Sequence, residues 1–267
     1  MTGSAAPLVS VIIPTYNRWP LVLEAIESVR NQTCRDFELI VVVDVKTTDG
    51  SADHLRSSDL PLRVVEAGDG LGAARNRGVD TASGEFVTFL DDDDLYEPDH
   101  LHNFTVALRR TPDAHFFATW AWLWDPATDR RQVTNQFNPH GLFETNLRGT
   151  AISPVTMFSR RSTIIELGGF VEGDVTEDWL YLCRLAQRHT VVPIPIPSVR
   201  IREHPGRSVR NAEAVIAKWE RSVALVLGDG YLDPPLDERQ RTLLAVTTER
   251  FCAGNLYADG QMRSARQ

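Results

Sequence analysis

Long apolar runs constrain the fold of this chain more than any other feature. Residues 9–13 and 37–43 are each almost continuously apolar, and Leu62–Val65 forms a third, shorter run. Between the first two runs, the segment around Ile26 has apolar residues at helical spacing. Strands covered by helices on both faces of a sheet have such unbroken apolar sequences. The pattern therefore predicts an α/β fold with a mostly parallel sheet flanked by helices.

The second half of the chain has a different texture. Residues 115–124 are aromatic and strand-like, and residues 125–149 are rich in Asn, Pro, Gly and Arg, which predicts a hairpin and a long loop where an acceptor is selected. Residues 177–188 predict a helix, and the prolines in residues 191–197 predict an edge strand or a surface crossing.

The end of the chain predicts a helical hairpin. Two amphipathic helices are expected after Arg207, packed on the main domain, where they either mediate homodimerisation or cover the acceptor. We therefore divide the chain into three parts: residues 1–112, which carry the α/β pattern, residues 113–206, and residues 207–267, a C-terminal helical appendage.

Composition narrows the class of protein. The 267 residues carry a formal net charge of −8, which argues against nucleic acid or an anionic membrane as a partner. The three cysteines are widely spaced, which indicates neither a disulfide framework nor a zinc site and favours a cytoplasmic location. We expect no transmembrane segment, because no stretch approaches the roughly 18–20 apolar residues of a membrane span.

Four consecutive aspartates, Asp91–Asp94, follow the apolar run that ends at Leu90. Acidic runs are often only solvated surface. This one comes at the carboxyl end of a predicted strand, where ligands bind in open α/β sheets. Adjacent like charges repel one another, and a bound cation or substrate would offset the repulsion. Carboxylate oxygens suit Mg²⁺ or Mn²⁺ better than zinc.

A glycine pattern offers a competing interpretation. Residues 68–73 fit Gly-x-Gly-x-x-Gly/Ala and have an acidic residue, Asp91, further on, which is typical of dinucleotide binding. However, the pattern follows the third strand and not the first, and four aspartates would repel a dinucleotide's phosphates. We therefore do not favour a dehydrogenase.

An ordered series of motifs resembles the family 2 glycosyltransferases with a GT-A fold. The series consists of Val9–Arg18, Asp44 after an apolar strand, Gly72–Gly78, Phe89–Asp94, Gly168–Phe170 and the pair Glu177 and Asp178. The resemblance extends from Val9 to about Arg207. It implies a Rossmann-like GT-A sheet and transfer of a sugar from a nucleoside diphosphate sugar to a hydroxyl acceptor, with inversion at the anomeric carbon. Residues 1–112 would then be the nucleotide-sugar-binding half, and residues 113–206 the acceptor-binding and catalytic half.

The resemblance assigns the nucleotide to the first loop and to Asp44. The loop residues are Pro14, Thr15, Tyr16 and Asn17. Tyr16 would stack on the base, Pro14 and Thr15 would shape that wall, and Asp44 would help to hold the base. The family usually has Asp-Asp-Gly-Ser where this chain has Asp44 followed by Val45. UDP and dTDP are the favoured carriers, and guanosine stays open.

Metal and diphosphate binding are also implied by the resemblance. Asp93 corresponds to the ligand of Mg²⁺ or Mn²⁺, while Asp91 and Asp92 would lie by the ribose and the donor sugar, and Asp94 would support the turn. Arg75 would contact the base or the diphosphate. In the segment around residue 204, the candidate residues are His204 as a second metal ligand and Arg202 and Arg207 as phosphate partners.

Asp178 corresponds to the family's catalytic base, and Glu177 would orient the acceptor or the start of the helix. The Gly168–Gly169 pair would let the backbone approach the donor sugar, or would simply end a helix. We expect a small molecule or a saccharide as acceptor. Two alternatives are kept: a sugar nucleotidyltransferase, and a non-catalytic protein that binds sugar nucleotides.

Overall fold

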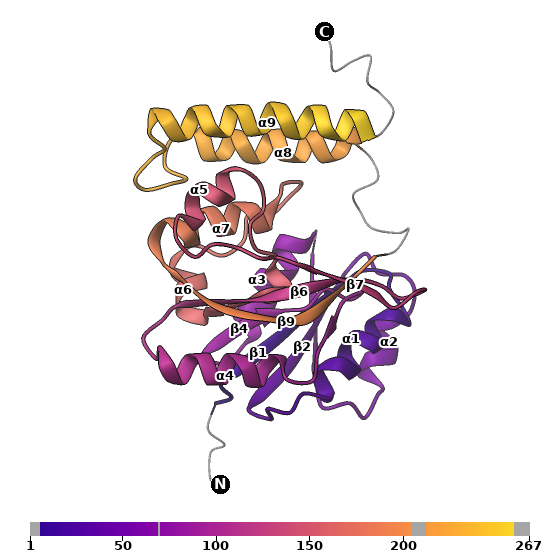
Figure 1. Ribbon diagram of the computed structural model, residues 1–267. Helices are drawn as coiled ribbons and strands as arrows, with labels where there is room; N and C mark the ends of the chain where they lie inside the picture. The colour runs from indigo at the N-terminus through magenta and orange to yellow at the C-terminus, as the bar shows by residue number, and fades with distance from the viewer. Residues whose placement is uncertain (1–5, 69, 204–211, 259–267) are drawn as a thin grey trace.

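The computed structural model describes residues 6–68, 70–203 and 212–258 as one sheet flanked by helices, with a helical hairpin stacked on one side (Figure 1). The strands are β1 (Val9–Thr15), β2 (Phe37–Asp44), β3 (Arg63–Ala67), β4 (Phe86–Phe89), β5 (Leu95–Tyr96), β6 (Phe116–Asp125), β7 (Arg130–Thr134), β8 (Met157–Arg160) and β9 (Val191–Arg202). The helices are α1 (Leu21–Arg30), α2 (Ser51–Arg56), α3 (Leu71–Thr81), α4 (His100–Arg110), α5 (Leu142–Leu147), α6 (Arg161–Glu166), α7 (Glu177–Arg188), α8 (Ala212–Leu227) and α9 (Glu238–Ala258), and Pro154–Thr156 forms a 3₁₀ turn.

The predicted parallel sheet is confirmed in the first half of the chain. The strand order is β3-β2-β1-β4-β8-β6-β9-β5, with β7 paired to β6, and β3, β2, β1 and β4 are parallel to one another. Strand β1 is buried throughout because helices cover both of its faces. Ile13 packs in the cluster that contains Ile26 of α1, while Ile12 packs in the cluster that contains Val79 of α3.

Strand order reverses at β1, and this reversal positions the site. The chain runs outward from β1 to β2 and β3 and then returns through α3 to β4 on the other side of β1. In open α/β sheets a crevice forms beyond the carboxyl ends of the strands at such a point. Loops following Thr15, Asp44 and Phe89 therefore meet at one edge of the sheet.

In the second half, β9 agrees with the prediction for the proline-rich segment and extends it. Residues 191–197 pair with β6, and β5 joins the other side of β9 at Val199 and Arg200, beyond the last proline. The proline segment is thus an edge strand, as prolines without an N–H require, and the strand continues to Arg202.

The predicted long loop between β6 and α6 contains more structure than expected. Strands β6 and β7 form the expected hairpin, but the loop beyond it also folds into α5. Leu142 and Leu147 anchor this short helix, because each is buried in a core cluster shared with α7. Tertiary packing thus stabilises a helix that the polar composition of the segment does not predict.

The C-terminal hairpin is present as predicted. Helices α8 and α9 lie together over α5 and α7, on the side of those helices that faces away from the sheet (Figure 1). Their contact with the rest of the domain is an apolar cluster that includes Trp219 and Leu244 of the hairpin and Trp179, Leu180 and Cys183 of α7.

The glycine pattern that suggested dinucleotide binding has a packing role at Gly72. A Cβ atom placed on Gly72 would lie 2.4 Å from the backbone carbonyl oxygen of Val171, so the start of α3 touches the segment after α6 directly. Gly168 and Gly169 end α6: both have positive φ, and their N–H groups bond to the carbonyls of Ile165 and Ile164. This is a helix C-cap, one of the two expectations.

A pair of alanine substitutions tests this contact. We expect Gly72→Ala to lower the free energy of unfolding by about 1–3 kcal/mol, because the new methyl group meets backbone and not a mobile side chain. Gly68→Ala is the matched control: its Cβ would meet nothing within 4 Å, and its effect should stay within about 0.5 kcal/mol. Urea unfolding measures both. Equal stability of the two variants would contradict this expectation, because it would show that the backbone around Val171 shifts to accommodate the methyl group at no cost in free energy.

Candidate active site

A cavity of about 510 Å³ lies at the carboxyl ends of β1, β2 and β4. Its lining residues are Pro14, Thr15, Tyr16, Arg18, Asp44, Lys46, Gly70, Leu71, Ala74, Asp91, Asp92 and Asp93. Seven residues expected from the sequence to bind nucleotide, sugar or metal thus share one cavity. They come from three separate strand ends because the topology brings those ends together.

One wall of the cavity carries Tyr16 and Asp44. The Tyr16 side chain is 53% exposed, so its ring is available to a planar ligand. The Asp44 carboxylate is held by two backbone N–H donors, from Lys46 at 2.8 Å and from Gly70 at 3.4 Å. Val45 is 58% exposed and does not replace the missing second acid.

Asn17 is used differently from its neighbours in the loop. Its φ of 50° is in the left-handed region, which Asn tolerates better than most residues. Its side-chain oxygen accepts a hydrogen bond from the N–H of Thr48 at 2.8 Å. The side chain therefore ties the first loop to the loop after β2, beside the cavity lining.

The aspartate run divides between the cavity and the turn below it. Asp91, Asp92 and Asp93 line the cavity, whereas Asp94 is 5% exposed and accepts a hydrogen bond from the N–H of Arg202 at 2.9 Å. Asp94 thus supports the turn, as the resemblance suggested. The Tyr16 N–H lies 3.4 Å from a carboxylate oxygen of Asp92, which links the acidic turn to the first loop.

Arg18 is a cavity residue that the sequence did not single out. Its guanidinium lies 3.5 Å from an Asp93 carboxylate oxygen and 3.9 Å from one of Asp92. The residue ends the Val9–Arg18 motif, but its position in the sequence does not reveal that its side chain turns back onto the aspartates. It supplies positive charge where a metal or a diphosphate would also be attracted.

Arg202 holds the aspartate turn instead of lining the cavity. Its Nε donates to the carbonyl oxygen of Asp93 at 2.9 Å, its terminal nitrogen pairs with Glu24 at 2.5 Å, and its guanidinium lies 4.8 Å from the Trp124 ring centre. The other two residues expected near it, His204 and Arg207, lie outside the described residues.

Arg75 joins the aspartate turn to α7. Its side chain is 2% exposed, and its guanidinium contacts Glu177 at 2.6 Å and Asp91 at 3.4 Å. The ring centres of Phe89 and Phe170 lie 5.8 and 5.5 Å from the central carbon of this guanidinium. The sequence placed Arg75 near the base or the diphosphate; in the structure it bridges β4 and α7.

This bridge sets Glu177, and with it Asp178, beside Asp91 at the edge of the cavity, although neither residue of the pair is among those that line it. Both residues occupy the first turn of α7, where the helix dipole favours negative charge. One Asp178 oxygen accepts the N–H of Trp179 at 2.7 Å. Asp178 remains partly exposed.

The chemistry of the site favours a cation with oxygen ligands. Among the residues that the structure describes, no group of three or more His, Cys, Asp or Glu side chains is arranged to hold a metal ion by itself. Mg²⁺ commonly binds through one or two carboxylates together with substrate phosphates, and Asp93 offers such a carboxylate on the cavity wall. The residues present fit a metal that arrives with a diphosphate.

Comparisons with known proteins indicate the family and the fold of the chain. The family model described as "Glycosyl transferase family 2" matches residues 10–168. The "Uncharacterized glycosyltransferase YwdF" of Bacillus subtilis (strain 168) is 30% identical over 197 residues, 72% of each protein. Three further relatives are longer, and the match covers less than a third of each.

Two solved structures show the same fold. TarS 1–349 of S. aureus in complex with UDP-GlcNAc has a TM-score of 0.62 at 20% identity, over 96% of this chain and 79% of that one. The mannosyltransferase PcManGT of Pyrobaculum calidifontis in complex with GDP-Man and Mn²⁺ has a TM-score of 0.61 at 19% identity, over 98% of this chain and 74% of that one. The likeness confirms a GT-A-like fold. None of the described helices is both long and apolar enough to span a bilayer.

Asp92 makes the stability of the ligand-free protein depend on pH. Burial, reinforced by the neighbouring charges of Asp93 and Asp91, raises the pKa of Asp92 to about 7. The pKa of Asp92 in the folded state lies above its unfolded value near 3.9. Between about pH 4 and pH 7 the Asp92 carboxyl is therefore protonated in the folded protein but ionised in the unfolded chain. The contribution of protonated Asp92 to the free energy of unfolding is complete below about pH 4 and is lost as the pH rises through 7.

We therefore expect the ligand-free protein to lose stability between pH 5 and pH 8, and Asp92→Asn to lose less. Without metal or nucleotide, the melting temperature measured at pH 5, 6, 7 and 8 should fall more steeply for wild type than for the variant. Parallel curves for the two proteins would contradict the assignment to Asp92.

Proposed function

We propose, since the chain belongs to glycosyl transferase family 2 and is therefore a glycosyltransferase, that it moves a sugar from a nucleoside diphosphate sugar to a hydroxyl acceptor with inversion at the anomeric carbon. One observation carries the proposal. Arg75 bridges Asp91, which lines the cavity, and Glu177, the neighbour of Asp178. The start of α7, which carries the candidate base, thus lies beside the acidic side of the cavity, and this closeness supports the proposal.

The first wall suits the nucleotide. The exposed ring of Tyr16 offers a stacking surface for the base, and the carboxylate of Asp44 offers an acceptor for an N–H group of the base or a hydroxyl. The similar structures hold UDP-GlcNAc in one case and GDP-Man in the other. We take a nucleoside diphosphate sugar as the donor and keep uridine, thymidine and guanosine as candidate bases.

The acidic wall suits the diphosphate and a divalent cation. Asp93 would hold Mg²⁺ or Mn²⁺, and Asp91 and Asp92 would lie by the ribose and the donor sugar. When bound, such a cation neutralises negative charge on the departing nucleoside diphosphate. Arg18 now pairs with Asp92 and Asp93, and its guanidinium can turn to a diphosphate oxygen once a cation takes its place at the carboxylates.

Asp178 would act as the general base. The acceptor oxygen attacks the anomeric carbon while the bond from that carbon to the diphosphate oxygen breaks, and the electron pair leaves with the diphosphate. The hydroxyl proton passes to the Asp178 carboxylate. Because attack comes from the face opposite the leaving group, the anomeric configuration inverts. Glu177 is held by Arg75 and so orients the helix turn that carries Asp178.

The proposed roles follow the division of the chain made from its sequence. Residues 1–112 supply the donor wall, residues 113–206 supply α7 and the acceptor side, and residues 207–267 supply the hairpin. The acceptor would enter on the α7 side, and we propose a small molecule or a saccharide.

Substitution of the base tests the proposal. Asp178→Asn should lower kcat by roughly 10²–10⁴-fold, because the amide cannot accept the proton, while the affinity for the nucleoside diphosphate stays within about twofold. Asp174→Asn is the matched control, since this carboxylate lies four residues earlier and its side chain is 64% exposed. It should leave kcat nearly unchanged.

The readout is nucleoside diphosphate released from a panel of donors and acceptors, together with calorimetry of nucleotide binding. Full turnover by Asp178→Asn would contradict its role as base. Release of pyrophosphate would instead support nucleotidyl transfer, and binding without turnover in wild type across the panel would support a non-catalytic sugar-nucleotide protein.

A further inference from the structure

Ser222 of α8 contacts the residue that opens α7. Its hydroxyl oxygen accepts hydrogen bonds from the backbone N–H and from the side-chain hydroxyl of Thr176, each at 2.8 Å. Ser222 is fully buried, and Thr176 directly precedes the helix that begins at Glu177. The C-terminal hairpin thus touches the backbone immediately before the carboxylate pair.

The bonding capacity of Ser222 is fully used at this contact. A serine hydroxyl has one hydrogen to donate and two lone pairs. The hydrogen goes to the carbonyl oxygen of Lys218 at 2.8 Å, one turn earlier in α8, and the lone pairs receive the two bonds from Thr176. The N–H groups at the start of a helix have no partner within the helix, so Ser222 serves as an external cap for α7.

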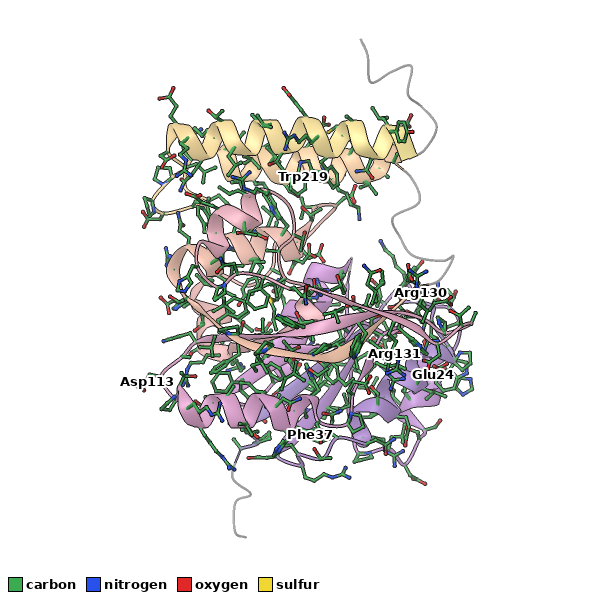
Figure 2. All side chains as sticks on the ribbon, in the orientation of Figure 1. Glu24, Phe37, Asp113, Arg130, Arg131 and Trp219 are labelled. Atoms are coloured by element: carbon green, nitrogen blue, oxygen red, sulfur yellow. The ribbon has the colours of Figure 1, made fainter. Side chains whose placement is uncertain are left out.

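Aromatic packing fixes the same turn from the same side. The rings of Trp179 and Trp219 have centres 4.6 Å apart, and the ring of Phe251 of α9 stacks on that of Trp219 with the centres 4.7 Å apart. Trp219 is labelled on α8 in Figure 2. Both tryptophans are almost completely buried, and Trp219 Nε1 donates to the hydroxyl of Thr248 on α9 at 3.1 Å. The cluster therefore leaves Trp179 little freedom to move.

Surface ion pairs contribute little to this contact. Lys218 and Arg221 of α8 both pair with Asp174, but the side chains of all three are about half exposed or more. Pairs of this kind typically contribute 0–1 kcal/mol. The buried hydroxyl and the tryptophan pair are the contacts that can set the position of the turn.

Glu177 and Asp178 therefore lie in a turn that is held from two sides. The hairpin holds Thr176 and Trp179, which flank the two carboxylates in sequence, and Arg75 holds Glu177 from the cavity side. We propose that Ser222 is a positioning residue for Asp178, and that the hairpin thereby forms part of the active site. This inference rests on the proposed function of Asp178.

Removal of the hydroxyl tests the proposal. Ser222→Ala should lower kcat about tenfold, because a small displacement of a reacting group has a large effect on rate, while the donor KM stays within about twofold. No residue of α8 lines the donor cavity, which is why KM should not change. Ser222→Thr keeps the hydroxyl and should restore most of kcat.

Thr248→Val is the matched control. It removes a partly buried hydrogen bond between α8 and α9 but leaves the bonds to Thr176 in place. If the hairpin contributes only to stability, Ser222→Ala and Thr248→Val should lower the melting temperature and kcat in parallel, and that result would overturn the proposal. Thr176→Val removes one of the two bonds from the opposite side and should give a smaller loss of kcat than Ser222→Ala.

Hydrogen exchange separates this inference from the function on which it rests. In Ser222→Ala, amides in the peptide that spans residues 174–182 should exchange faster than in wild type and in Thr248→Val, whether or not the right acceptor is known. Unchanged protection of that peptide would overturn the positioning role even if the protein is an active transferase. If these amides exchange faster in Ser222→Ala but the wild-type protein is inactive, the result would support the contact and contradict only the proposed reaction.

Discussion

The buried guanidinium of Arg75 is the interaction on which the rest of the site depends. Without it, Asp91 at the end of β4 and Glu177 at the start of α7 would place like charges close together in a poorly solvated region, which would separate the two segments. A buried charge must in turn be paired, so the carboxylates stabilise the arginine as much as it stabilises them. The turn after β4 and the start of α7 are therefore linked through this buried charge.

Packing around Arg75 fixes its position in the fold. The next residue, Asn76, exchanges two hydrogen bonds with the backbone of Phe170, at 2.9 and 2.8 Å. Gly72 allows the start of α3 to touch the backbone at Val171. On its far side, α7 is held by the hairpin through Ser222 and Trp219. The sheet thus positions the cavity, and two layers of helix position the start of α7, which carries the candidate base.

The frame of the fold and the meeting of the strand-end residues in one cavity were well predicted from the sequence, because both depend on local patterns. Apolar runs predict buried parallel strands, and residues that follow such strands meet at one sheet edge, as Tyr16, Asp44 and Asp93 do. The direction of long side chains was not predictable. Arg75 meets a partner 102 residues away, and Arg202 turns to the Asp93 carbonyl and not to the cavity. Neither contact can be inferred from the spacing of residues along the sequence.

Calorimetric titration of UDP, dTDP, GDP and CDP, each with Mn²⁺, with Mg²⁺ and with EDTA, tests the central claim that this cavity binds a nucleoside diphosphate together with a cation. We predict that one diphosphate binds only when the metal is present, and that Asp93→Asn abolishes the difference in affinity between metal and EDTA. Binding that is equal in EDTA, or no binding of any diphosphate, would contradict it.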